Sequence, residues 1–265
     1  MIVFPMAGLS RRFRDAGYER PKYMLEAHGC SLFRHAVESF CGLFADESLL
    51  FIARDEAGTV DFITRECAAM GVVSFQVVVL EAPTRGQAET VRLGVERAAV
   101  PAATPLLIFN IDTFRPGYSW PQTIDSRAVD GYLEVFVGSG SQWSFVRPSR
   151  NNDCRVAETA EKRPISDLCC TGLYWFSRCD SFIRAYDAQI KAGEETLHAG
   201  ELYVAPLYNF LIAEGADIRF NIIDREAVIF CGVPAEYDAF CARSSTPQKS
   251  KSLLSRECGC LPEER

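Results

Sequence analysis

Near its N-terminus the chain reads Ile2-Val3-Phe4-Pro5-Met6, followed directly by Ala7-Gly8-Leu9-Ser10-Arg11-Arg12-Phe13. The first part is a short apolar run, which is typical of a strand buried on both faces. A glycine after such a strand lets the backbone approach a ligand closely, so that loop N–H groups can bind phosphate oxygens. The segment therefore predicts the first strand of an α/β sheet, with a ligand-binding turn at its carboxyl end.

Apolar runs and helical patterns alternate along the rest of the chain. We predict strands at 49–53, 72–80 and 105–110, separated by helices at 32–43, 60–70 and 90–99. Later segments are shorter: strands at 131–137, 143–146, 155–159, 171–176, 218–223 and 227–230, and helices at 181–191 and 203–214. This rhythm predicts an α/β fold with a Rossmann-like, mixed but mostly parallel sheet flanked by helices.

Size and composition favour a single domain. The 265 residues are 48% hydrophobic and 24% charged, so the chain can bury a sizeable core and is not mainly disordered. The last segment, 243–265, contains Ser, Thr, Pro and Lys without periodicity, which predicts a flexible tail. We therefore expect one domain over residues 1–242 and a tail over 243–265.

The charge balance restricts the partners. With 28 basic and 35 acidic residues the net charge is −7, which disfavours nucleic acid and anionic membrane surfaces as partners. A small phosphate can still bind locally, because Arg11, Arg12, Arg20 and Lys22 lie within one short segment. No apolar run is long enough for a membrane span, and no signal peptide is recognisable.

Cysteine usage points to a reducing compartment. The 11 cysteines are odd in number and lie in apolar segments, so we expect most of them to act as small hydrophobes in the cytoplasm. Their spacing disfavours a structural zinc site, because Cys169-Cys170 and Cys258-x-Cys260 have no second pair nearby.

Three positions at predicted strand ends can carry chemistry. The loop around Gly8 lacks the G-x-G-x-x-G and Walker A patterns, so it is either a different phosphate loop or a solvated basic loop. Asp112 follows a buried strand and is either a Mg²⁺ ligand or a turn residue. Lys162, beside Glu161, either binds a second phosphate or forms a surface ion pair. In the first case Gly172 leaves room for an acceptor.

In this order the motifs resemble the nucleotidyltransferase family typified by sugar-1-phosphate nucleotidylyltransferases, the NDP-sugar pyrophosphorylases, including bacterial capsule-biosynthesis members. The resemblance covers about residues 1–240. Its landmarks are the Gly8–Arg12 loop, Pro21-Lys22, Arg85-Gly86-Gln87-Ala88-Glu89-Thr90, Asp112, Glu161-Lys162, Gly172-Leu173-Tyr174 and Cys231-Gly232-Val233-Pro234-Ala235-Glu236-Tyr237.

The resemblance implies transfer of a nucleoside monophosphate from an NTP to a sugar 1-phosphate or similar small phosphate, with release of pyrophosphate. It implies Mg²⁺ as cofactor and a role in capsule or surface polysaccharide biosynthesis. Its catalytic residues map onto Arg12, Lys22, Asp112 and Lys162, with Asp112 as the metal ligand. Nucleotide binding maps onto Ala7, Gly8, Leu9, Ser10, Gly86, Gln87 and Asn110, and acceptor binding onto Glu161, Gly172 and Glu201, with Trp143 and Tyr203 as further candidates.

Two departures from the family pattern leave alternatives open. Ser10 replaces a second glycine, and Phe230 replaces an Asp that serves as second metal ligand. Either Asp112 and the nucleotide hold the metal, or Asp224 or Glu226 substitutes, or activity is lost.

Alternative functions follow from these departures. One is a catalytically silent nucleotide-binding or regulatory homologue. Another is a metal-dependent glycosyltransferase, although the Asp-x-Asp of such enzymes is absent after Asp112. The sequence leaves open the base, the acceptor and whether the chain forms a homo-oligomer.

Overall fold

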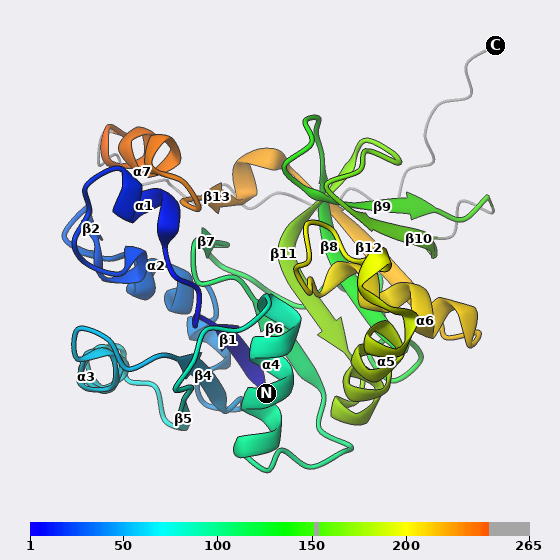
Figure 1. Cartoon of the computed structure of the whole chain (residues 1–265), viewed down its shortest axis with the longest axis horizontal. Helices are drawn as coiled ribbons and strands as arrows, with labels where there is room; N and C mark the ends of the chain where they lie inside the picture. The colour runs from blue at the N-terminus through cyan, green and yellow to red at the C-terminus, as the bar shows by residue number, and fades with distance from the viewer. Residues whose placement is uncertain (151–153, 244–265) are drawn as a thin grey trace.

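A mixed nine-stranded sheet forms the centre of the computed structural model, which describes residues 1–150 and 154–243 (Figure 1). Its main path runs β10-β9-β11-β6-β1-β4-β5, and β8 pairs with both β11 and β12. The strands are β1 (Ile2–Pro5), β4 (Leu49–Ala53), β5 (Phe75–Val79), β6 (Leu106–Phe109), β8 (Gly131–Val137), β9 (Ser144–Pro148), β10 (Val156–Glu161), β11 (Leu168–Phe176) and β12 (Ile218–Ile223). The predicted tail, apart from residue 243, lies outside the described residues.

The N-terminal half of the sheet is parallel, as the sequence predicts. Strand β1 lies between β4 and β6, with Val3 paired to Leu50 on one side and to Ile108 on the other. All residues of β4 and β6 are buried, because helices cover both faces.

Strand β11 changes the direction of the sheet. It runs antiparallel to β6, β8 and β9, while β12 runs parallel to β8. Seven of the nine strands consequently share one direction, and only β10 and β11 oppose it. The mixed but mostly parallel sheet predicted from the sequence is therefore confirmed.

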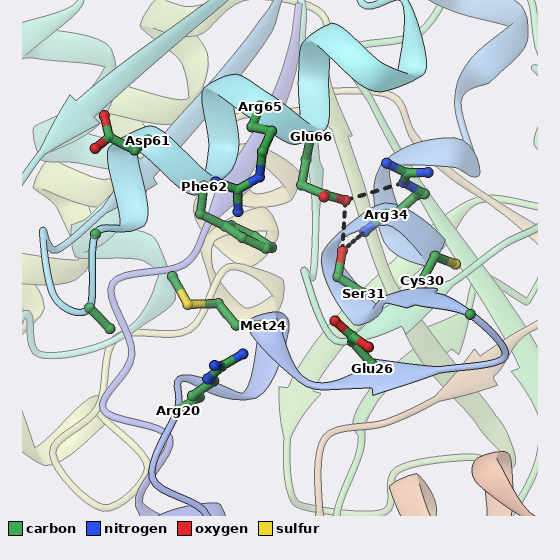
Figure 2. Close-up of a pocket in the computed structure, with 13 residues that line it drawn as sticks. Arg20, Met24, Glu26, Cys30, Ser31, Arg34, Asp61, Phe62, Arg65 and Glu66 are labelled. Carbon is green, nitrogen blue, oxygen red and sulfur yellow. Dashed lines mark hydrogen bonds and ion pairs between the residues drawn. The ribbon is translucent and has the colours of Figure 1, made fainter.

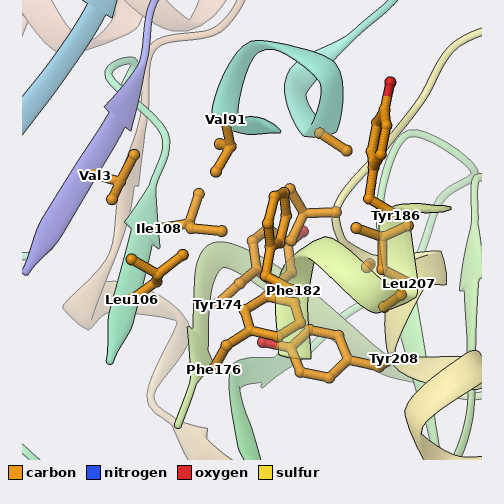
Figure 3. Close-up of a cluster of buried hydrophobic side chains, with 14 of the residues drawn as sticks. Val3, Val91, Leu106, Ile108, Tyr174, Phe176, Phe182, Tyr186, Leu207 and Tyr208 are labelled. Carbon is orange, nitrogen blue, oxygen red and sulfur yellow. The ribbon is translucent and has the colours of Figure 1, made fainter. Parts of the chain in front are cut away.

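Two layers of helices cover the sheet. On one face lie α4 (Gln87–Arg97), α5 (Cys179–Ala192) and α6 (Tyr208–Ala213), and Figure 3 shows Val91, Phe182 and Tyr208 packed with strand side chains. On the other face lie α2 (Leu32–Glu38), α3 (Thr59–Met70) and α7 (Pro234–Cys241). The remaining elements are α1 (Arg11–Asp15), the pairs β2 (Glu26–Ala27) with β3 (Cys30–Ser31) and β7 (Thr113–Phe114) with β13 (Ile229–Phe230), and the 3₁₀ turns η1 (Lys22–Met24), η2 (Cys41–Leu43), η3 (Glu194–Thr196), η4 (Ala205–Leu207) and η5 (Arg225–Ala227).

Two predicted helices are shorter than their hydrophobic pattern indicates. The helix predicted at 32–43 ends at Glu38, where the Ser39 hydroxyl donates to the His35 carbonyl and the chain continues as η2. The helix predicted at 203–214 divides into η4 and α6, because Pro206 cannot donate a backbone hydrogen bond. The sequence analysis missed α1 and α7 altogether.

No helix within residues 1–150 and 154–243 is long and apolar enough to cross a membrane. The nine cysteines of the described part are free thiols, and five of them are buried: Cys67, Cys169, Cys170, Cys179 and Cys231. These buried thiols serve as small core side chains, as the sequence analysis expects.

Candidate active site

A cavity of about 920 Å³ opens where β1, β6, β10 and β11 meet the loops that follow or precede them. This is the edge of an α/β sheet at which ligands bind. Its wall contains the sequence-predicted site residues except Asp224, namely Ala7, Gly8, Leu9, Ser10, Arg12, Lys22, Gly86, Gln87, Asn110, Asp112, Glu161, Lys162, Gly172 and Glu201. The further candidates Trp143 and Tyr203 also line it.

The loop after β1 is closed by Ser10. This residue has the left-handed backbone conformation, with φ at 50°, which a glycine adopts without strain. Its hydroxyl accepts a hydrogen bond from the Lys22 backbone N–H at 3.4 Å. The serine thus keeps the turn that a glycine would allow and ties the loop to Lys22, a contact that a glycine could not make.

Lys22 and Asp112 meet in the middle of the cavity. The Lys22 ammonium forms an ion pair with the Asp112 carboxylate, and both side chains are about one-fifth exposed. Lys22 comes from η1 and Asp112 from the turn after β6, so two loops distant in sequence supply the pair. Opposite charges here can serve a phosphate and a cation that bind together.

The turn before α4 packs closely against a neighbouring segment. Gly86 has φ at 143°, and a Cβ on it would lie 2.5 Å from the Leu202 carbonyl oxygen. Glycine is therefore required here. The next residue, Gln87, donates a hydrogen bond to the Asn110 side chain. Its amide oxygen has no hydrogen-bond partner among the described residues and can accept from a ligand.

Glu161 is the buried carboxylate of the cavity. Its side chain is 6% exposed, and it accepts a hydrogen bond from the Ser144 hydroxyl. Burial raises the pKa of Glu161 above the ordinary range of a glutamate, against the lowering effects of Ser144 and Lys162. A carboxylate held this firmly can orient a polar ligand.

Lys162 lies beside Glu161 in a strained conformation. Its φ is 50°, and its backbone N–H donates to the Trp143 carbonyl. The ammonium is 4.0 Å from a Glu161 oxygen and donates to the Tyr203 hydroxyl, which itself donates to Glu201. Strained residues of this kind are concentrated at functional sites, and the ammonium can bind a phosphate.

A bulge in β11 shapes the far wall. Pairing with β8 shifts between Cys170 and Tyr174, and Gly172 within the shift has φ at 96°. A Cβ on Gly172 would lie 2.4 Å from the Asn110 side-chain nitrogen, so only glycine fits there.

Phe230 does not leave an open metal position. Its ring packs against Trp143, with centroids 4.6 Å apart, and the Arg225 guanidinium lies 4.8 Å from its centre. Asp224 and Glu226 are exposed and do not line the cavity, because the chain between β12 and η5 is directed away from it. The structure thus does not bring Asp224 to Asp112.

A carboxylate that the sequence analysis missed lies near Asp112. A Cβ on Gly232 would be 3.1 Å from an Asp112 oxygen and 3.6 Å from a Glu236 oxygen, so both carboxylates lie close to Gly232. Glu236 also accepts from the Gly232 N–H at 2.8 Å. Burial, with the charges of Asp112 and Glu236, raises the pKa of the Cys231 thiol to about 12. The capping pattern Pro234-Ala235-Glu236 was the available sequence signal.

A second cavity, of about 580 Å³, lies between α3 and the β2–β3 hairpin (Figure 2). It contains none of the sequence-predicted site residues. Its three arginines face three carboxylates, and Glu66 is bonded to both Arg34 and Ser31. The charges balance, so this cavity does not select an anion.

No family model and no curated protein sequence matches the chain. Among solved structures, a nucleoside-diphosphate-sugar pyrophosphorylase from Vibrio cholerae is 48% identical, with a TM-score of 0.87 over 92% of this chain and 100% of the other.

More distant structures share the fold. A putative glucose-1-phosphate thymidylyltransferase from Bacillus anthracis is 16% identical, with a TM-score of 0.69 over 91% of this chain and 93% of the other. The inositol-1-phosphate CTP transferase from T. maritima is 15% identical, with a TM-score of 0.67 over 90% of this chain and 92% of the other. At these identities the likeness concerns the fold alone.

Proposed function

The chain belongs to the nucleoside-diphosphate-sugar pyrophosphorylases, a family of nucleotidyltransferases, and we propose that it joins a nucleoside monophosphate from an NTP to a sugar 1-phosphate or a similar small phosphate. The observation that carries this proposal is the single cavity that combines the Lys22–Asp112 pair with Lys162 and Glu161. Two of the cations that line this cavity, Lys22 and Lys162, come from separate segments and suit two phosphorylated substrates.

The nucleotide binds along the loop after β1 in this proposal. Backbone N–H groups near Gly8 cradle the phosphates, Lys22 neutralises the α-phosphate and Arg12 the departing pyrophosphate. Gln87 and Gly86 contact the base. The free amide oxygen of Gln87 supports this assignment, since it accepts from a base that carries a donor.

The acceptor binds on the opposite side. Lys162 holds its phosphate, Glu161 orients its remaining polar groups, and Gly172 leaves space for it. An oxygen of the acceptor phosphate attacks the α-phosphorus, the bond to the bridging oxygen breaks, and pyrophosphate leaves. A phosphate dianion is already a competent nucleophile, so positioning and charge neutralisation supply the catalysis.

Mg²⁺ fits the donors at Asp112. This ion takes one or two carboxylates together with phosphate oxygens and water, and Asp112 and Glu236 both lie close to Gly232. No group of three or more His, Cys, Asp or Glu side chains in the described ranges could hold a metal by itself, so substrate phosphates would complete the shell. When bound, the ion supplies charge neutralisation at the phosphates. We therefore propose Asp112 as a ligand, supported by Glu236 rather than Asp224.

The test is a matrix of the common NTPs against phosphorylated sugars, polyols and amino alcohols, with Mg²⁺ and a pyrophosphate assay. We expect release with at least one pair, and loss of that release in Asp112→Asn. Asp224→Asn is the matched control and should retain full activity. NTP binding by calorimetry without pyrophosphate from any pair would instead support a catalytically silent homologue.

We also propose that the product serves capsule or surface polysaccharide biosynthesis in the cytoplasm. The support is the resemblance of the ordered set of motifs to a family that includes bacterial capsule-biosynthesis members. Identification of an accepted sugar phosphate in the same matrix would test this assignment.

A further inference from the structure

A buried ion pair outside the cavity wall is not used by the proposed mechanism. Glu134, on β8, is 1% exposed, and its two carboxylate oxygens lie 3.1 and 3.2 Å from Arg115 Nε. Burial raises the pKa of Glu134, against the lowering effect of Arg115. Nearby, the Tyr118 hydroxyl is buried without a hydrogen-bond partner within the described ranges, so it does not donate to the pair.

Glu134 faces the bulge that contains Gly172. Val135 pairs with Cys170 and Leu133 with Tyr174, so this one residue of β8 lies opposite the bulged residues of β11. The Thr171 hydroxyl donates to a Glu134 oxygen at 3.3 Å. The Glu134 carboxylate therefore holds the first residue of the bulge, directly before Gly172.

Arg115 belongs to the segment that carries Asp112. It follows β7, and its backbone N–H donates to the Ser39 hydroxyl at 2.9 Å. In the same segment, the Asp112 carbonyl accepts from the Cys231 N–H at 2.8 Å. Arg115 therefore connects two parts of the cavity. Its backbone belongs to the segment that carries Asp112, and its guanidinium contacts the Glu134 carboxylate, which holds the β11 bulge.

We propose that the Arg115–Glu134 pair is a positioning device that fixes the Asp112 segment relative to the β11 bulge. This proposal rests on the function proposed above. Neither residue lines the cavity, so both act through others: Arg115 through Asp112, and Glu134 through Thr171 and Gly172. Their contact sets the separation between the groups assigned to the nucleotide and those assigned to the acceptor.

Stability alone does not explain why the pair is buried. Desolvation of two charges offsets most of their attraction, and well-packed apolar residues in their place are often neutral or stabilising. A salt bridge to arginine, however, admits few geometries, because the guanidinium is planar and its donors are fixed. Fixed geometry is what two substrates that react with each other require.

The test compares two double variants that each replace an ion pair by apolar residues. Arg115→Met with Glu134→Leu removes the proposed device, and Arg34→Met with Glu66→Leu removes the pair at the second cavity (Figure 2) as a matched control. We expect both to unfold within a few degrees of the parent. The first should lose about 100-fold in kcat, the usual effect of an ångström-scale misplacement, with KM for the NTP changed less than about threefold. The control should keep its kcat.

Two conservative variants keep the test decisive if the first double variant does not fold. Arg115→Lys retains the charge without the planar donors, and Glu134→Gln retains the shape without the charge. Both should fold and lose at least about tenfold in kcat at an unchanged KM for the NTP. A kcat within threefold of the parent in the folded double variant, or in both conservative variants, would overturn the proposal.

Failure of the proposed function can be told apart from failure of this inference. If the parent protein releases no pyrophosphate with any pair, the function fails, and Mn²⁺ binding in the presence of nucleotide becomes the readout. Paramagnetic resonance should then give at least tenfold weaker Mn²⁺ binding in the Arg115 and Glu134 variants than in the control. Equal affinities would overturn the positioning role.

Discussion

Lys22 and Asp112 already neutralise each other before any substrate binds. In the proposed reaction Lys22 contacts the α-phosphate and Asp112 the metal ion. The side chains of their ion pair are only about one-fifth exposed. Removal of either partner leaves a partly buried charge and also removes a contact to the reacting phosphates. The effects of such substitutions should therefore be large in kcat and modest in folding.

Asp112→Asn and Lys22→Met are each expected to lower kcat by at least about 100-fold, the usual scale for lost electrostatic stabilisation of a transition state. Steady-state pyrophosphate release measures this effect. Lys191→Met, on α5 and away from the cavity, is a suitable control for loss of a lysine. A rate within tenfold of the parent in either variant would contradict the assigned roles.

Glu161 gives the proposed reaction a characteristic pH dependence. Because burial raises its pKa, the carboxylate takes up a proton at a higher pH than an ordinary glutamate does. Acceptor use should consequently fall as the pH drops through this raised pKa, since a protonated Glu161 accepts hydrogen bonds poorly. Above that pH, and above the second pKa of the acceptor phosphate at about 6, the dependence should be flat.

The measurement is kcat/KM for the acceptor between about pH 4 and 8, with Glu161→Gln as the comparison. The variant should be weaker throughout and should keep only the acid limb that protonation of the acceptor phosphate produces. An acid limb of the same position in both proteins would show that another group titrates.

At the scale of elements, two glycines allow neighbouring segments to meet at the cavity. Gly86 permits the turn before α4 to touch the segment around Leu202, and Gly172 permits the β11 bulge to touch Asn110. Both have φ values that other residues rarely adopt. These contacts, rather than the helices and strands themselves, bring together the two sides of the cavity that we assign to the nucleotide and to the acceptor.

Gly86→Ala should destabilise the protein by about 1–3 kcal/mol, because a Cβ there overlaps the Leu202 backbone and the conformation is strained. It should also raise KM for the NTP, since Gln87, the residue assigned to the base, directly follows Gly86 at the start of α4. Gly42→Ala is the control, because a Cβ at Gly42 meets nothing within 4 Å. Urea unfolding and NTP titration measure both effects, and equal stability of the two variants would contradict this account.

Helices and strands can be predicted from the sequence when a single signal, such as an apolar run, is strong. Apolar runs at β1, β4 and β6 are long enough to indicate buried strands, and glycine or acidic residues mark their ends. Helix α1 contains Arg11, Arg12 and Arg14, which have no apolar period, and α7 is short and begins at Pro234. Neither has the signal on which sequence reasoning depends.

The residues of the candidate site form the same two groups, those with a local sequence signal and those without one. Residues in local motifs, such as Lys22 and Asp112, could be predicted because each follows a recognisable strand or turn. The Arg115–Glu134 pair could not, since its role depends on a contact between separate segments. Glu236 had only a local capping pattern as its signal, and its closeness to Asp112 depends on segments far apart in sequence. Asp224 was a candidate only by proximity in sequence to Phe230, and the local chain direction separates it from the cavity.

At the scale of the molecule, the cavity collects residues from nearly the whole described chain. Its wall contains residues from the loop after β1 to Glu236 at the start of α7. The sheet strands in this part of the chain run in both directions (Figure 1). The fold and the site are therefore formed by the same long-range contacts.

Deletion of residues 244–265 tests the proposed domain limits. We expect a chain ending at residue 243 to keep its unfolding temperature and, within about twofold, its kcat, because among the described residues the cavity wall ends at Glu236. A chain ending at residue 230 should lose both, since it lacks α7 and the Gly232–Glu236 segment. A marked loss of activity in the longer chain would extend the functional unit beyond residue 243.

During synthesis on the ribosome, the contact between Cys231 and Asp112 forms late. A nascent chain can complete β1 and β6 and still lack the Gly232–Glu236 segment that closes on Asp112. A nucleotide stabilises only the states to which it binds, so the cell's nucleotide pool would give little help to a partly synthesised chain. Early folding must then rely on the aromatic and aliphatic core alone, and mutations in that core would limit the yield of protein before they affect its chemistry.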